Sequence, residues 1–264
     1  MGTHAKSKLL IAAGKELAYV KKQELRLSKE AMRKSLPVKD TISEKIPDKW
    51  EEKLEIAFCK AFELMFTKGA GWVEKTYHRE AMENEYKIQN YTVDLVGSRK
   101  ALKEFRRAGI KKQSSHLLAH TAGGVGLGAL GIGLPDIIGF IAVLLRGVFA
   151  LCLQYGIDYE KPEEQFFILK MMEASLSKER DFISRNAETD ALLLHPVCTE
   201  ALSEQMRKTA QAMALDMLCL KFIQGIPVVG MIGGLGNPVY GHKILNYVRI
   251  KCYKRYLLEK INSM

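Results

Sequence analysis

One segment, from His120 to Gly147, constrains the fold more than any other part of the chain. It holds eight glycines among otherwise apolar residues, and the pair Pro135-Asp136 and one arginine interrupt it. A membrane-spanning helix needs about 20 predominantly apolar residues, whereas the uncharged run from Thr121 to Pro135 has 15. We therefore expect a buried hairpin, a re-entrant element or an interfacial helix pair rather than a plain membrane span.

A second glycine-rich segment near the C-terminus repeats this pattern. When Pro135 is aligned with Pro238, glycines coincide two and four residues before each proline. Both prolines suit the first position of a helix. The uncharged run from Phe222 to Gly241 has 20 residues, but two prolines and several glycines interrupt it. Three interpretations stay open: contact with a membrane, close helix packing inside a bundle, or anion binding by backbone N–H groups.

The rest of the chain predicts an all-α protein, because apolar residues recur at helical spacing and no run alternates as a β-strand does. We expect a single multi-helix bundle of seven to ten helices with two glycine-rich apolar helical hairpins. A charged helix and a proline-containing linker are expected over residues 1–45, and the main helical domain over 46–264. Helices are predicted to start after Asp48, at Pro135 and at Pro162, and one to end at Gly109.

Two basic segments border the apolar hairpins, in a chain whose net charge is +10. Basic helices with interleaved tyrosines suit an anionic leaflet, which attracts each basic residue with about 1 kcal/mol. Nucleic acid is not expected, since no nucleic-acid-binding motif accompanies these residues. The expected lipid-binding or anion-binding residues are Arg99, Lys100, Arg106, Arg107, Lys111, Lys112, Arg249, Lys251, Lys254 and Arg255.

Catalytic and metal-binding motifs are missing from the sequence, so we expect no cofactor and no metal, and an enzyme is not favoured. The weak catalytic candidates are Asp136, His116 and His120. The two histidines are four residues apart on one helix face, which is half a metal site. The acid follows a helix-starting proline, where the helix dipole favours a carboxylate.

The five cysteines are scattered without a C-x-x-C pair, which indicates a reducing compartment. Together with the basic segments, this predicts a protein at the cytoplasmic side of a membrane, peripheral to its inner face.

The segments "GLPD", "YGIDYEKPEEQFFIL" and "IPVVGMIGGLGNPVYGHKI" resemble the EcsC family of bacterial proteins. The resemblance covers roughly residues 50–260. It implies a helical protein of unsettled activity, whose family takes its name from a protein encoded beside an ABC transporter. The positions that match the family pattern, without assigned roles, are Asp136, Tyr155, Asp158 and Asn237.

We therefore expect a membrane-associated helical protein that binds anionic lipids through its basic helices, with a membrane protein as a further possible partner. Two alternatives stay open. One is a lipid-directed hydrolase that uses Asp136 with His116 or His120. The other is a soluble adaptor or interaction protein, linked to a transporter or exported as an effector.

Overall fold

The computed structural model describes residues 3–33, 48–67, 78–127, 134–223 and 238–264. The predicted all-α fold is confirmed, because these residues form nine helices and no strand. The helices are α1 (Thr3–Arg33), α3 (Asp48–Thr67), α5 (Arg79–Val96), α6 (Arg99–Leu127), α7 (Leu134–Gln154), α8 (Pro162–Leu176), α9 (Glu179–Ala191), α10 (Leu202–Ile223) and α11 (Pro238–Asn262).

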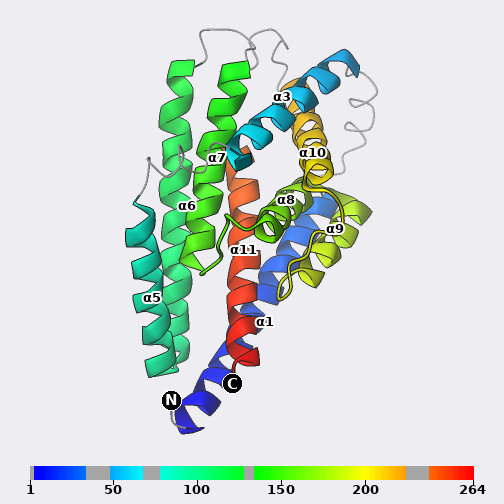
Figure 1. Cartoon of the computed structure of the whole chain (residues 1–264). Coiled ribbons are helices and arrows are strands. Elements are labelled where there is room, and N and C mark those ends of the chain that lie inside the picture. The colour runs from blue at the N-terminus through cyan, green and yellow to red at the C-terminus, as the bar shows by residue number, and fades with distance from the viewer. Residues whose placement is uncertain (1–2, 34–47, 68–77, 128–133, 224–237) are drawn as a thin grey trace.

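Helix α11 lies at the centre of the bundle (Figure 1). It contacts α1, α6, α7 and α8, while α3 packs on α10 at the other side of the molecule. Consecutive residues of α11 are buried around its whole circumference, including Ile244, Leu245, Tyr247 and Val248. A helix covered on every side is expected to be apolar all round, so the charges of α11 must be neutralised inside the protein.

Helix α1 belongs to the same bundle. It packs against α11, α6 and α9, and Leu9, Ala13 and Val20 on its inner face are buried in the common core. Helix α1 is therefore packed into the same bundle as the helices that follow residue 46.

The boundary between α5 and α6 differs from the prediction of one helix that ends at Gly109. Gly97 ends α5 in the left-handed conformation, with φ of 58°, which glycine adopts without steric cost. The Ser98 hydroxyl then accepts a hydrogen bond from the Ala101 N–H at 3.2 Å and caps α6.

Helix α6 continues through Gly109 because this glycine serves packing rather than termination. A Cβ atom at position 109 would lie 2.1 Å from the hydroxyl oxygen of Tyr155. The missing side chain thus makes the space into which the Tyr155 ring inserts.

The turn between α7 and α8 follows the predicted chemistry. Gly156 takes a φ of 78°, and Pro162 occupies the first turn of α8 as expected. The Asp158 carboxylate accepts a hydrogen bond from the Glu160 N–H at 3.3 Å, which is a turn-stabilising contact.

The two glycine-rich connections, residues 128–133 and 224–237, lie outside the described residues. The helices α6 and α7, which the first connection joins, lie side by side (Figure 1). Within the described part of the chain, one stretch, Ile137–Gln154 of α7, is long and apolar enough to cross a membrane by length and composition. Since 78% of that stretch is buried in the bundle, it also has the character of a core helix.

Candidate functional site

The weak catalytic candidates cannot be brought together as a site from the described side chains. The side chains of His116, His120 and Asp136 lie outside the described residues, as does Asn237. Among the described residues, no group of His, Cys, Asp and Glu side chains could hold a metal ion.

Tyr155, another family-pattern residue, is buried with no hydrogen-bond partner for its hydroxyl. Burial raises the pKa of this phenol well above its usual value. Asp158, by contrast, lies at the surface turn, where its Oδ1 atom is 3.5 Å from the guanidinium of Arg79. The two residues therefore do not share a common pocket, and the structure assigns Asp158 a turn and ion-pair role.

The cations of α11 are engaged inside the bundle. The side chain of Lys251 is fully buried, and its Nζ atom lies 2.6 Å from Glu24 of α1 and 2.5 Å from Asp190 of α9. Lys254 binds the same two carboxylates at 3.0 Å and 2.8 Å. Two ammonium groups and two carboxylates thus form one neutral cluster that joins three helices.

Arg255 and Arg249 are held in a similar way. The guanidinium of Arg255 donates to both carboxylate oxygens of Glu164 on α8, at 2.7 Å and 2.8 Å. Arg249 is buried and donates to the amide oxygens of Gln113 and Asn246 at 2.7 Å and 2.8 Å. Burial lowers the pKa of Arg249.

These contacts correct the expectation that α11 presents its cations to a lipid surface. A buried cation that is already paired gains little from an external headgroup, and withdrawing it from its partner is costly. The tyrosines interleaved with these cations are likewise buried core residues and not an interfacial belt. They are Tyr247, Tyr253 and Tyr256.

The cations at the start of α6 divide into two groups. Arg106 points inward, and its Nε atom lies 3.0 Å from the fully buried carboxylate of Glu16. Arg99 binds the other oxygen of the same carboxylate at 3.0 Å, and Lys112 lies 2.9 Å from Glu85 of α5. The side chains of Lys100, Arg107 and Lys111 are exposed.

The outer face of α1, which sequence reasoning did not select, is strongly basic. Its apolar centre consists of exposed residues at intervals of seven, which drift only about 20° per step around a helix. These are Ile11, Ala18, Leu25 and Met32. Exposed cations border them at Lys8, Lys15, Lys21, Lys22, Arg26 and Lys29, and Lys6 is exposed near the start of the helix.

Helix α1 has three acids, of which Glu16 and Glu24 point away from solvent and Glu30 is exposed near the C-terminal end of the helix. Glu16 is fully buried and accepts hydrogen bonds from Arg99, Arg106 and Tyr253. Glu24 is partly buried in the cluster with Lys251 and Lys254. Between residues 6 and 29, the exposed face of α1 therefore carries cations and no exposed acid.

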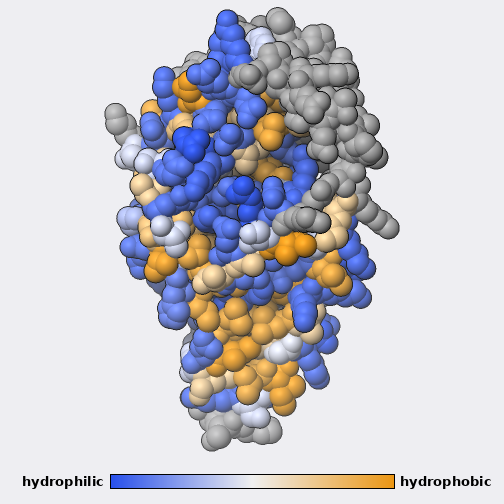
Figure 2. All heavy atoms as spheres, turned by 90° about the vertical axis from the view of Figure 1, so that its right-hand side faces the viewer, coloured by the Kyte–Doolittle hydropathy of each residue, from blue (hydrophilic) through white to orange (hydrophobic). Residues whose placement is uncertain are grey.

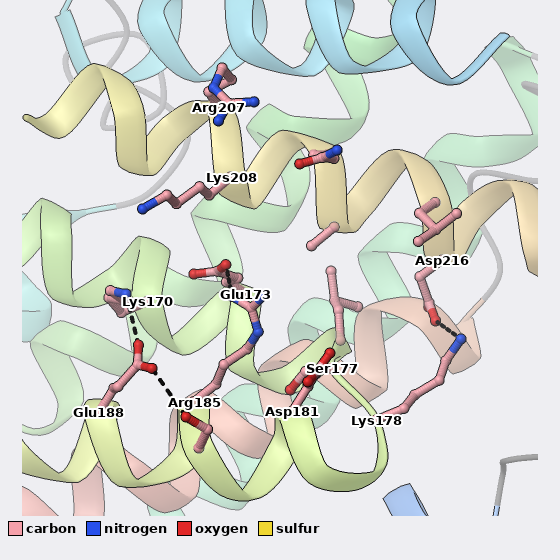
Figure 3. A pocket seen from close by; sticks show the side chains of 15 residues that line it. Lys170, Glu173, Ser177, Lys178, Asp181, Arg185, Glu188, Arg207, Lys208 and Asp216 are labelled. Carbon is pink, nitrogen blue, oxygen red and sulfur yellow. Dashed lines mark hydrogen bonds and ion pairs between the residues drawn. The ribbon is translucent and has the colours of Figure 1, made fainter. Parts of the chain in front are cut away.

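A polar cleft of about 670 Å³ lies between α8, α9 and α10. Figure 2, drawn from the side of α9 and α10, shows it as a hollow surrounded by hydrophilic residues. Figure 3 shows that Lys170, Arg207 and Lys208 lie toward one end of the cleft and Asp181 and Asp216 toward the other. Helix α8 forms its floor, while α9 and α10 form its two walls.

The charges of the cleft are partly paired along each wall. Lys170 of α8 lies 3.0 Å from Glu188 of α9, and the hydrogen bond from Lys170 lowers the pKa of that carboxyl. Arg185 of α9 binds the buried carboxylate of Glu173. These pairs fasten α9 to α8. Among the described residues that line the cleft, there is no His–Ser or His–Cys pair that could act as a nucleophile and base.

Sequence reasoning missed the outer face of α1 because the whole helix reads as mixed in charge. The signal was present only in the spacing: Glu16 and Glu24 are eight residues apart and so lie on nearly the same side of a helix. Which side faces solvent was decided by the partners of these acids, which come from α6, α9 and α11.

The sequence matches the EcsC protein family over residues 12–257. This match begins within α1, earlier in the chain than the resemblance that we drew from residues 50–260. No curated protein and no solved structure matches the chain.

Proposed function

Since the chain belongs to the EcsC protein family, whose name assigns no reaction, we propose from its own surface that it is a peripheral membrane protein. In this proposal it binds anionic lipid surfaces through the outer face of α1. The observation that carries the proposal is the sorting of charge on this helix. Its exposed side carries cations and no acid between residues 6 and 29, because Glu16 and Glu24 are buried or paired internally, and the exposed Glu30 follows in the last turn.

The pattern suits a bilayer surface better than a partner helix. A basic amphipathic helix lies in the interface with its apolar residues at the boundary and its lysines among the headgroups. The apolar centre of the outer face, including Ile11 at 59% and Leu25 at 55% exposure, would enter that boundary. A coiled-coil partner would need a second apolar stripe, but the intervening outward positions are Gly14 and Lys21.

The surroundings of α1 support the same orientation. The face drawn in Figure 2 carries hydrophobic residues at the end where α1 begins. Exposed Leu95 and Val96 at the end of α5 precede Arg99 and Lys100 in the chain, and both α5 and α6 contact α1. Cations with neighbouring aliphatic side chains are the features by which proteins attach to an anionic cytoplasmic leaflet.

The test is flotation with vesicles of phosphatidylcholine, alone or with phosphatidylserine. We expect recovery only with the anionic vesicles, and loss of recovery as the salt concentration rises. Replacing three outer-face lysines by glutamine, K15Q/K22Q/K29Q, removes about 3 kcal/mol of attraction, which is about 100-fold in partitioning.

A matched control changes the net charge equally at another place. The triple variant K53Q/K60Q/K161Q replaces three exposed lysines outside α1 and should bind vesicles like the wild type. Equal losses in the two triple variants would reduce the effect to net charge alone. Absence of flotation with either vesicle would remove the proposal and leave the adaptor hypothesis.

A further inference from the structure

The cleft between α8, α9 and α10 has a basic end, where the floor and both walls contribute cations. Lys170 contributes from the floor, Arg185 from α9, and Arg207 and Lys208 from α10. The two α10 cations have their ion partners outside the cleft: Arg207 binds Glu204 and Glu55, and Lys208 binds Glu200. Each of the four cations is thus ion-paired, and a phosphate would bind by accepting from the N–H groups that these pairs leave open.

The two acids at the basic end differ in how firmly they hold their cations: the buried Glu173 keeps Arg185 in place, whereas Glu188 holds Lys170 weakly. Glu173 is buried beneath the floor, where Gln205 also donates to it at 2.9 Å. Glu188 lies at the rim with 49% of its side chain exposed. Because an exposed carboxylate can rotate into water at little cost, Glu188 can release Lys170 to a stronger anion.

The opposite end of the cleft has different chemistry. Its lining contains Asp181, Asp216 and Ser177, together with Gln211 from α10. Asp216 is almost buried and is held by Lys243 and Lys178 at 3.5 Å and 3.9 Å. Carboxylates and hydroxyl groups are acceptors and donors for the hydroxyl groups of a polyol.

From this polarity we propose that the cleft binds a phosphorylated polyol, with its phosphate between Lys170, Arg185, Arg207 and Lys208. Its hydroxyl groups would then bind the acidic and serine-containing end. Arg and Lys are the side chains that recognise phosphate, and the volume of about 670 Å³ lies within the range of small-molecule sites. The proposal is independent of α1 and of membrane attachment through its outer face.

The first experiment is isothermal titration of the full chain with myo-inositol monophosphate, inorganic phosphate and myo-inositol. We expect the inositol phosphate to bind at least tenfold more tightly than either fragment, because each fragment reaches only one end of the cleft. Equal binding of inorganic phosphate and inositol phosphate would overturn the polyol part of the proposal. If none of the three compounds binds, the proposal that the cleft takes a free, soluble ligand is overturned.

Two variants separate binding from folding. K170Q/K208Q should weaken binding at least tenfold, whereas the matched pair K60Q/K161Q, which lies elsewhere on the surface, should not. E188Q should tighten binding several-fold, because it removes the carboxylate that competes for Lys170. A gain of affinity cannot arise from misfolding, so E188Q tests the proposed phosphate site even if K170Q/K208Q does not fold. Unchanged affinity in E188Q would contradict the proposed phosphate position.

The polyol phosphate can come from a free metabolite or from a lipid headgroup, and a second experiment distinguishes them. Flotation of K15Q/K22Q/K29Q with phosphatidylcholine vesicles that contain phosphatidylinositol removes the contribution of the outer face of α1. Recovery that K170Q/K208Q abolishes, without binding of free inositol phosphate, indicates a lipid headgroup. Binding of free inositol phosphate without flotation indicates a soluble ligand, and the absence of both overturns the proposal. The cleft variants should float on phosphatidylserine vesicles like the wild type. Failure of the cleft proposal can therefore be distinguished from failure of the proposal that α1 binds the membrane.

Discussion

Replacing Lys251 by methionine should destabilise the protein strongly, although it removes one of 40 basic residues from a chain with a net charge of +10. The side chain of Lys251 is fully buried between Glu24 and Asp190, at 2.6 Å and 2.5 Å. Methionine preserves the length but leaves two carboxylates with Lys254 alone. Loss of one partner from a buried ion cluster costs about 3–5 kcal/mol.

For a chain of this size, 1 kcal/mol corresponds to about 2–4 °C in Tm, so K251M should unfold roughly 10 °C below the wild type. K254M should cost less, because 19% of the Lys254 side chain is exposed and the buried Lys251 still contacts both carboxylates. The measurement is thermal and guanidinium unfolding followed by circular dichroism. Adding Asp190→Asn to K251M should recover part of the loss, since it removes the carboxylate that K251M leaves poorly compensated.

The control for this prediction is Lys22→Met on the exposed side of α1, which should change stability by about 0.5 kcal/mol or less. If K251M were as mild as this control, Lys251 would be solvated. The placement of α11 at the centre of the bundle would then be wrong.

Three further predictions concern the core and its titrating groups. Gly109→Ala should cost about 1–3 kcal/mol by overpacking against the Tyr155 hydroxyl, and Tyr155→Phe should recover part of this; equal unfolding midpoints of Gly109→Ala and wild type would contradict the fit. A maleimide should label the exposed thiol of Cys198 first in the native protein. Partial burial and three nearby glutamates raise the pKa of Cys59 to about 11, so that thiol should react more slowly. Burial raises the pKa of Tyr155 and Tyr240 above the ordinary value of 10. The stability that these buried phenols contribute is therefore present below pH 10 and is lost as the pH rises above it. Tyrosinate absorbance should appear together with unfolding, and its appearance in folded protein would argue against buried phenols.

The helices themselves could be predicted from local sequence because their signals are local. Asp48 and Pro162 mark helix starts that the structure confirms. The misplaced boundary at Gly109 shows the limit of such signals. A glycine that ends a helix and a glycine that admits a tyrosine ring read alike in sequence, and only Tyr155, 46 positions further along the chain, distinguishes them.

The surface properties of the basic segments could not be predicted, because burial depends on partners from distant parts of the chain. Helix α11 carries six Lys/Arg between His242 and Lys260 and reads as a solvated or lipid-bound helix. Its charges are neutralised by Glu24, Asp190 and Glu164, which come from three different helices. Local charge runs in α1 and α11 look similar, yet one helix lies at the surface and the other at the centre.

The most direct test of the α1 surface measures which side of the molecule meets the bilayer. A nitroxide is attached at Ala18→Cys, in the centre of the outer face, or at Lys161→Cys in the α7–α8 turn, each in a C198S background. On anionic vesicles, the label at position 18 should lose accessibility to a water-soluble relaxing agent and gain accessibility to oxygen, while the label at position 161 stays unchanged. Unchanged accessibility at position 18 in protein that floats with the vesicles would contradict attachment through α1.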